Sequence, residues 1–310
     1  MNEPPANSRF PQCFAPQQLR VRKPPSTGGR LRPGQHAVIT GGSSGLGLEL
    51  AGQLARRGIS VTLFARDLNR LERAREHITG LAPAADVRVA SVDVTDPTAT
   101  HAAFDEVAAA AGTIDVLINS AGILREGYFE RLGHDDFRQL MDTNFFGVVN
   151  ATAACLPHLK KSRGRIVNVG SLAGLVGTFG LTAYGAAKYA LTGFSAALRV
   201  ELEPQCIAVQ LVCPAEFDSP MVDLLNTYRT PENRAHSQSV PVLPISRVAS
   251  ETIRGIDTGD HLIIPGAAIR LAWRVSRFAP GLIHRYFQRR LASVYQGPDG
   301  GSRRPVCSPT

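Results

Sequence analysis

The chain has 310 residues, of which 44% are hydrophobic and 19% are charged, with a formal net charge of +8. These values fit one large globular domain with extra segments at its ends. No run of eighteen apolar residues is present, which argues against a transmembrane helix. The five cysteines form no CxxC pair and no metal-ligand cluster, so we expect reduced thiols, a cytoplasmic setting and no metal site.

Residues 1–35 contain seven prolines interleaved with six basic residues. Such a stretch cannot form a helix or bury much apolar surface, so we expect a disordered Pro/Arg-rich arm. It lacks the apolar core of a secretory signal. Much of the excess positive charge lies here and near the carboxyl end, and no recognisable nucleic-acid reader accompanies it, so we expect no nucleic-acid partner.

From residue 36 onward, short Val- and Ile-rich runs alternate with helical patterns. This alternation predicts an α/β fold, a doubly wound parallel seven-stranded Rossmann sheet with helices on both faces, over residues 36–266. The predicted strands are His36–Thr40, Ser60–Ala65, Val87–Val92, Val116–Asn119, Arg165–Val169, Ala208–Cys213 and His261–Ile264.

Helical patterns cover Leu48–Arg57, Asp135–Lys161 with an interruption expected near Pro157, and Ala183–Glu203. Residues 216–258 mix Pro, Ser, Asn and Arg with short apolar pieces, which favours a substrate lid. Residues 267–295 predict a basic amphipathic helical extension, broken into two helices at Pro280-Gly281, and residues 296–310 a flexible tail.

A glycine-rich loop directly follows the first predicted strand and precedes a helical pattern. Glycines allow backbone N–H groups to approach a pyrophosphate, and the helix presents its positive end to it. The loop therefore predicts a dinucleotide site. Its candidate binding residues are Gly41, Ser43, Ser44, Gly45, Leu46 and Gly47.

A tyrosine and a lysine, Tyr184 and Lys188, lie four residues apart in a helical pattern. Residues at this spacing share one helical face, so the ammonium can lie near the phenol. We expect the lysine to lower the pKa of Tyr184 below its usual value of about 10 and so to ease proton transfer.

The spacing TGxxxGxG and the motif YxxxK resemble those of the short-chain dehydrogenase/reductase family. Ser171, after the fifth predicted strand, and Asn144 match the other two members of the family's catalytic tetrad. The resemblance implies that Tyr184 protonates the developing alkoxide and that Ser171 hydrogen-bonds the carbonyl oxygen. It implies further that Lys188 binds the nicotinamide ribose and that Asn144 holds a water in the proton relay.

The same resemblance assigns the remaining cofactor contacts. NAD-specific relatives carry an acidic residue at the end of the second strand, whereas this chain has Ala65 and then Arg66, which favours the 2′-phosphate of NADP(H). Asn119 either contacts the cofactor or mainly ties the sheet together. Further contacts are implied at Asp93, Val94, Ala121, Gly122, Pro214 and Ser219, the last in place of the family's threonine.

The segment that begins at Pro214 and the run from Gly177 to Lys188 resemble those of 3-ketodihydrosphingosine (3-dehydrosphinganine) reductases. This resemblance implies reduction of the 3-keto group of a long-chain sphingoid base. Other lipophilic carbonyls, such as 3-oxoacyl chains, steroids and retinoids, remain alternatives because the catalytic residues would be identical. A non-catalytic NADP-sensing module is a hypothesis of a different class, and the intact tetrad argues against it.

Two further interpretations concern surfaces. The extension mixes arginines with aromatic and aliphatic residues, which fits either peripheral contact with an anionic membrane or packing over the pocket or a neighbouring subunit. Small residues along the Tyr184 helix, Gly185, Ala186, Ala190 and Gly193, allow close helix packing and favour a homo-oligomer.

Overall fold

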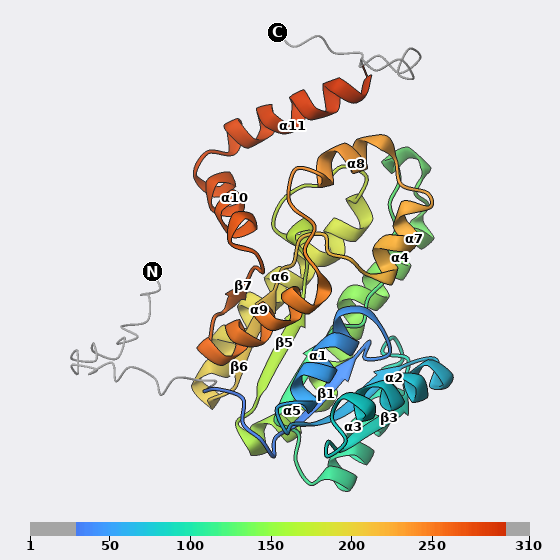
Figure 1. Cartoon of the computed structure of the whole chain (residues 1–310), viewed down its shortest axis with the longest axis vertical. Helices are drawn as coiled ribbons and strands as arrows, with labels where there is room; N and C mark the ends of the chain where they lie inside the picture. Colours follow the sequence, from blue (N-terminus) through green and yellow to red (C-terminus); the bar gives the residue numbers. More distant parts are fainter. Residues whose placement is uncertain (1–28, 296–310) are drawn as a thin grey trace, which may run out of the picture.

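The computed structural model describes residues 29–295. Its seven-stranded sheet is entirely parallel, in the order β3-β2-β1-β4-β5-β6-β7 (Figure 1). The strands are β1 (His36–Thr40), β2 (Ser60–Ala65), β3 (Val87–Ser91), β4 (Val116–Asn119), β5 (Arg165–Val169), β6 (Ala208–Val212) and β7 (Leu262–Ile263). The predicted α/β class, strand number and direction are confirmed.

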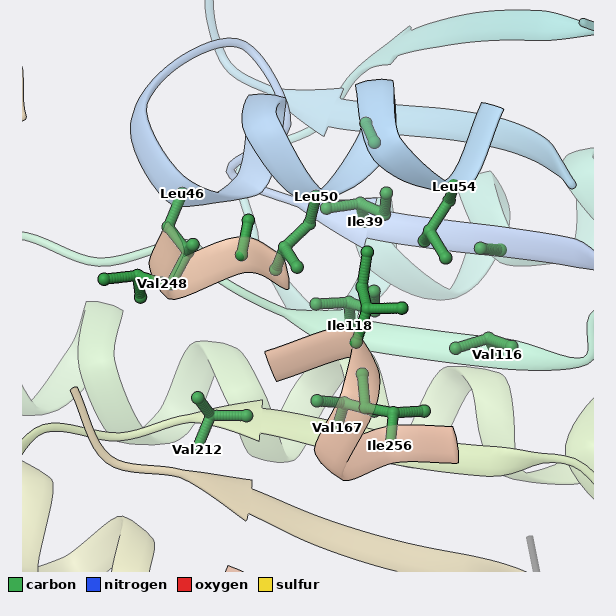
Figure 2. Packing of buried hydrophobic residues seen from close by; sticks show 14 of the residues in the cluster. Ile39, Leu46, Leu50, Leu54, Val116, Ile118, Val167, Val212, Val248 and Ile256 are labelled. Atoms are coloured by element: carbon green, nitrogen blue, oxygen red, sulfur yellow. The ribbon is translucent and has the colours of Figure 1, made fainter. Parts of the chain in front are cut away.

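Helices cover both faces of the sheet because alternate side chains of each strand point to opposite faces. Those on one face are α1 (Gly45–Ala55), α2 (Leu68–Leu81) and α9 (Ile245–Thr258), and those on the other are α3 (Pro97–Ala111), α5 (Gly147–Ser162) and α6 (Thr182–Leu202). In β1, Ile39 packs toward α1 while its neighbour Val38 joins the opposite cluster. Figure 2 shows how Leu46, Leu50 and Leu54 of α1 meet the strands on the first face.

From β1 the chain adds β2 and β3 on one side, and then returns to add β4 to β7 on the other side, so β1 and β4 lie side by side where the strand order reverses. In open parallel sheets a ligand site forms outside the carboxyl ends of the strands at this point. The loops after β1 and β4 approach each other closely, because the Thr40 hydroxyl accepts hydrogen bonds from the backbone N–H groups of Ser120 (3.1 Å) and Ala121 (3.2 Å).

Short elements surround this edge. They are the 3₁₀ turns η1 (Phe129–Arg131) and η3 (Leu172–Gly174), α4 (His134–Met141), the π-helical turn η2 (Asp142–Phe146), α7 (Pro220–Asn226) and α8 (Pro231–Ser237). Residues 216–244, which include α7 and α8, form the cover over the edge. A further 3₁₀ turn, η4 (Glu203–Gln205), lies at the opposite edge, between the end of α6 and the start of β6. The pattern predicted over 135–161 is interrupted at η2 and not near Pro157, which lies inside α5. Pro157 has no N–H to donate to the carbonyl of Ala153. Both residues are exposed, so water can bind this carbonyl instead.

The predicted lid, residues 216–258, divides into two parts. Val248, Ala249, Ile253 and Ile256 of α9 are buried in the cluster that covers the sheet, so this helix is a layer of the fold. Only residues 216–244 can therefore act as a lid over the substrate, and that function stays a proposal. The extension forms the helices α10 (Ala267–Phe278) and α11 (Pro280–Tyr295), which break where Pro280-Gly281 predicted.

The predicted disordered arm, residues 1–35, includes seven residues that are ordered in the structure. Residues 29–35 lie on the domain: Leu31 is buried and donates its N–H to Asp257 at 2.9 Å, and Gly34 donates its N–H to the carbonyl of Gly58 at 2.8 Å. The rest of the arm, residues 1–28, and the predicted tail, 296–310, lie outside the described residues. Within residues 29–295, no helix combines the length and apolar character that crossing a membrane requires.

Candidate active site

A cavity of about 280 Å³ opens at the carboxyl edge of the sheet, beneath α7 and α8. It brings together residues that are far apart in sequence, from the loop after β1 to the helix α6 and the loop after β6. The predicted site residues that line it are Gly41, Ser44, Gly45, Leu46, Gly122, Asn144, Ser171, Tyr184, Lys188, Pro214 and Ser219. All four members of the predicted catalytic set therefore face one space.

Tyr184 and Lys188 lie in the first two turns of α6, and both are buried. The Lys188 Nζ donates a hydrogen bond to the carbonyl oxygen of Val169 at 2.9 Å and lies 5.7 Å from the centre of the Tyr184 ring. Ser171 begins η3, where its Oγ accepts the N–H of Ala173 at 3.2 Å, and its side chain hydrogen-bonds Tyr184. The hydroxyl, the phenol and the ammonium thus lie around a single point.

The electrostatics of this trio differ from the prediction. Burial raises the pKa of Tyr184 to about 12, and the hydrogen bond with Ser171 lowers it by less. Burial also lowers the pKa of Lys188 to about 8. The expected lowering of the Tyr184 pKa by Lys188 is therefore wrong, because desolvation of the phenol outweighs every favourable interaction. The phenol is protonated at neutral pH, which is the form that a proton donor needs.

Asn144 occupies the middle of the π-helical turn between α4 and α5. Its Oδ1 accepts the N–H of Ile123 and its Nδ2 donates to the carbonyl of Ile123, both at 2.9 Å. A Cβ on Gly122 would stand 2.9 Å from the Asn144 Oδ1 and 3.8 Å from the Lys188 Nζ. The glycine thus allows the loop after β4 to pass between these two side chains, and a π-turn at a site residue is a frequent mark of function.

The glycine loop has the shape that a close-lying phosphate requires. Gly41 adopts φ +69°, and a Cβ there would stand 2.7 Å from the backbone nitrogen of Ala121. A Cβ on Gly47 would collide with the carbonyl oxygen of Gly41. Only glycine fits these two positions, because there the loop packs closely against the loop after β4 and against its own start. Gly45, with φ +56° and nothing within 4 Å of an added Cβ, lies open at the positive end of α1, so the residues present fit the pyrophosphate of a dinucleotide.

Other predicted cofactor residues lie along the same edge but outside the cavity: Ser43, Gly47, Arg66, Asp93, Val94, Asn119 and Ala121. Arg66 is exposed directly after β2, and its carbonyl accepts the hydroxyl of Ser91 at 2.9 Å. Asp93 accepts the N–H and the hydroxyl of Thr95 at 3.0 and 2.8 Å. Arg66 and Asp93 continue the line from the glycine loop toward β3, and contact with a cofactor remains a prediction for all seven residues.

The side chain of Asn119 ties the sheet together. Its Nδ2 donates to Asn168 of β5 at 2.9 Å and to Thr152 of α5 at 3.3 Å. Asn168 in turn donates to Ser195 of α6 at 2.9 Å. These hydrogen bonds link β4 and β5 to α5, which follows the turn that holds Asn144, and to α6, which holds Tyr184. Of the two interpretations of Asn119, this geometry favours the structural one.

The loop after β6 reaches the catalytic residues directly. The carbonyl of Pro214 accepts the N–H of Leu172 at 2.8 Å, which fixes this loop beside Ser171. Ser219 lines the cavity and caps α7, accepting the N–H of Val222 at 3.4 Å. Burial raises the pKa of the Cys213 thiol to about 12, so that thiol is neutral beside the catalytic residues.

A buried polar cluster in the cover was not predicted. Arg229, whose side chain is 4% exposed, pairs with both carboxylate oxygens of Glu216. Its remaining donors bind Asn226 at 3.1 Å and Asn233 and Ser237 at 2.6 Å, so each of its five N–H groups has an acceptor. No local motif marks such a cluster, because its members come together only when α7 and α8 fold over the loop after β6.

The cover is also tied to the loop after β4. Glu126 accepts the N–H (3.1 Å) and the hydroxyl (2.6 Å) of Thr230, and Tyr128 donates to Glu232 at 2.9 Å. Apolar side chains form most of the remaining wall and were not predicted as site residues: Leu124, Val176, Leu181, Phe217, Met221, Val222, Leu225, Val240 and Phe287. Among residues 29–295, no three His, Cys, Asp or Glu side chains gather as a metal site would require.

Comparison with known proteins agrees with this geometry. A zebrafish 3-dehydrosphinganine reductase is 34% identical over 231 residues, 73% of this chain and 70% of that protein. An Arabidopsis thaliana 11-beta-hydroxysteroid dehydrogenase-like 4A is 34% identical over 253 residues, 81% and 82% of the two chains. The solved structure of a Sphingobium yanoikuyae short-chain dehydrogenase in complex with NADPH has a TM-score of 0.68 at 28% identity, covering 81% of this chain and 95% of that one.

The model of the family described as short chain dehydrogenase matches residues 35–229. This range contains the glycine loop, the π-helical turn and all four predicted catalytic residues. The chain therefore belongs to the short-chain dehydrogenase family of nicotinamide-dependent oxidoreductases.

Proposed function

We propose that the protein reduces the carbonyl group of a lipophilic substrate with NADPH, and that this carbonyl is the 3-keto group of a long-chain sphingoid base. One observation carries the proposal. Asn144, Ser171, Tyr184 and Lys188 line the same apolar-walled cavity that the glycine loop borders. A substrate carbonyl in that cavity is within reach of a proton donor and a hydrogen-bond donor at once.

The reaction follows from these groups. When bound, the reduced nicotinamide supplies the hydride. Ser171 donates a hydrogen bond to the carbonyl oxygen, and Tyr184, protonated because of its raised pKa, gives its proton to the forming alkoxide. Lys188, anchored to Val169, would hold the nicotinamide ribose, and Asn144, fixed by Ile123, would hold the relay water.

Arg66 supports the preference for NADPH over NADH. It is exposed at the carboxyl end of β2, where Ala65 is the last strand residue. The nearest acidic residue, Asp67, caps α2 by accepting the N–H of Arg70 at 3.0 Å. A guanidinium pairs with a 2′-phosphate, which a carboxylate would repel. The serines of the glycine loop, Ser43 and Ser44, are only partly buried and add hydroxyl donors on the same side.

The substrate class is supported by the relatives and by the cavity wall. Vertebrate relatives carry the name of the sphingoid-base reductase, and the wall consists mainly of aliphatic and aromatic side chains. A steroid ketone is the second candidate, favoured by the Arabidopsis relative. We propose further that the enzyme is a cytoplasmic homo-oligomer that works at a membrane surface. The free cysteines Cys155, Cys206 and Cys213 support a reducing compartment.

A substrate panel tests the proposal. We expect rapid NADPH oxidation with 3-ketosphinganine and slower oxidation with a 3-oxoacyl thioester and a steroid ketone. Fastest turnover with the steroid would select the second candidate. Tight NADPH binding without turnover of any ketone would instead indicate a sensing module.

A further inference from the structure

Helices α10 and α11 both expose apolar side chains to solvent. On α10 these are Leu271 (63% exposed), Val275 (40%) and Phe278 (90%), which are four and three residues apart and so lie on one side of that helix. On α11 they are Leu282 (56%) and Tyr286 (42%), four residues apart. We call these five side chains the apolar face. Figure 1 shows both helices projecting beyond the sheet, at the end of the molecule where α8 lies.

The same segment carries charge of one sign only. Residues 267–295 contain six arginines and neither aspartate nor glutamate. Arg274, Arg277, Arg285 and Arg289 are exposed beside the apolar face. Exposed apolar side chains bordered by arginines match the two layers of an anionic bilayer surface, acyl chains below and negative headgroups above.

A second copy of this chain fits the face less well. A two-fold contact would place the same surface of each subunit against the other, and therefore the four exposed arginines beside the face against their own copies. Like charges brought together while solvent is removed oppose association. The charge thus favours an acidic partner surface over self-association.

The other side of α11 forms part of the cavity wall. Phe287 lines the cavity and stacks on His236 of α8, with ring centres 3.9 Å apart and planes within 5°. Successive residues of a helix point about 100° apart, and the neighbouring Tyr286 is 42% exposed, where its hydroxyl accepts a hydrogen bond from the Nε of Arg290 at 3.3 Å. Helix α11 therefore contributes side chains both to the cavity wall and to the apolar face.

We propose that α10 and α11 form a docking surface for anionic membrane lipid, with Leu271, Val275, Phe278 and Leu282 in the acyl region and Tyr286 and the arginines at the headgroups. The inference rests on the proposed function and deepens it, because docking would bring the cavity wall formed by α11 to the membrane in which a long-chain ketone resides.

Flotation of the full-length protein with vesicles tests the docking surface without any assay of activity. We expect binding to phosphatidylcholine vesicles that contain phosphatidylglycerol, weaker binding to phosphatidylcholine alone, and weakening by salt. Because each interfacial arginine contributes about 1 kcal/mol, Arg274→Gln/Arg277→Gln should lower the affinity roughly 30-fold. Phe278→Ser, at a fully projecting side chain, should lower it as well without unfolding the protein.

A matched control lies on α2, at the opposite edge of the molecule: Arg73→Gln/Leu81→Ser removes one exposed arginine and one exposed leucine. This variant should float like the wild type. No binding to anionic vesicles at low salt, or equal binding by all variants, would overturn the inference. A change from dimer to monomer in Phe278→Ser without any lipid dependence would assign the face to a second copy instead.

A rate measurement separates this inference from the proposed function. With the long-chain ketone embedded in anionic vesicles, Arg274→Gln/Arg277→Gln should be slowed, whereas with a short water-soluble ketone it should match the wild type. If the wild type reduces neither ketone, the proposed function is contradicted, and the vesicle-binding experiment alone then tests the docking surface.

Discussion

The sheet and the cover over its carboxyl edge are held together by different forces. The sheet is stabilised by apolar burial on both faces, with residues such as Ile39, Leu50 and Ile118 fully inaccessible. The cover, residues 216–244, is held by a buried ion pair and side-chain hydrogen bonds around Arg229 and Thr230. Apolar burial tolerates changes of neighbour, whereas a polar cluster depends on each partner and its direction.

The residues proposed for catalysis and those proposed to determine substrate specificity therefore lie in different regions. The catalytic side chains stand on α6, η2 and the loop after β5, which the sheet holds rigidly. The wall that a substrate tail contacts comes largely from the cover and α11. Changes in the sheet layer should therefore alter turnover, and changes in the cover should alter substrate affinity.

The largest effect is expected at the proton donor. Tyr184→Phe removes only the hydroxyl, so kcat should fall by about 10³-fold, the usual scale for loss of a general acid. Binding of NADPH, followed by the quenching of protein fluorescence, should stay within a few-fold of wild type. Turnover close to the wild-type rate would remove Tyr184 from the mechanism.

Arg229→Met tests the cover. It leaves the Glu216 carboxylate buried without its partner, which costs about 3 kcal/mol for a buried pair broken on one side. We expect faster hydrogen exchange in α8 and a raised KM, while amides of β1 and kcat change little. The double variant Arg229→Met/Glu216→Leu should recover much of the loss. Equal acceleration of exchange in sheet and cover would mean that the two regions are one cooperative unit.

Arg66→Ala tests the cofactor preference, which we assign to a residue at the carboxyl edge of the sheet and not to the cover. Losing a charge-assisted contact of roughly 1.5–3 kcal/mol should lower kcat/KM for NADPH about 10- to 100-fold. The value for NADH should stay nearly unchanged, which serves as the internal control. An equal fall with both cofactors would show that Arg66 acts on folding and not on the 2′-phosphate.

The smallest effect concerns pH. Burial lowers the pKa of Lys188 to about 8, so its ammonium loses its proton as the pH rises through that value. If the charged form is required, kcat/KM for reduction should fall about tenfold per pH unit above this point. Lys188→Arg keeps its charge, so its residual activity should lack this decline. The same decline in both proteins would exclude Lys188 as its cause.

Most of the sheet was predictable because its signals are local. Buried parallel strands are recognised as short Val- and Ile-rich runs, and four of the seven predicted strands, such as His36–Thr40, agree with the structure at both ends. The interruption of Asp135–Lys161 was misplaced because a π-turn has no residue signature, whereas an exposed proline inside a helix can be tolerated.

The candidate site was predictable where residue types and spacing are dictated by chemistry, as for Tyr184, Lys188 and the glycine loop. The pKa of Tyr184 was not, because burial depends on how the cover closes. The partnership of Arg229 with Glu216 was hidden for the same reason: thirteen positions apart, they meet only through the path of α7.

Isotope transfer tests the central claim most directly. NADPH that carries deuterium at its transferable position is incubated with the protein and 3-ketosphinganine, and the product is analysed by mass spectrometry. The account predicts sphinganine with a single deuterium on its carbinol carbon, formed at a strongly reduced rate by Tyr184→Phe. Unlabelled product, or no product while a different ketone is reduced, would contradict it.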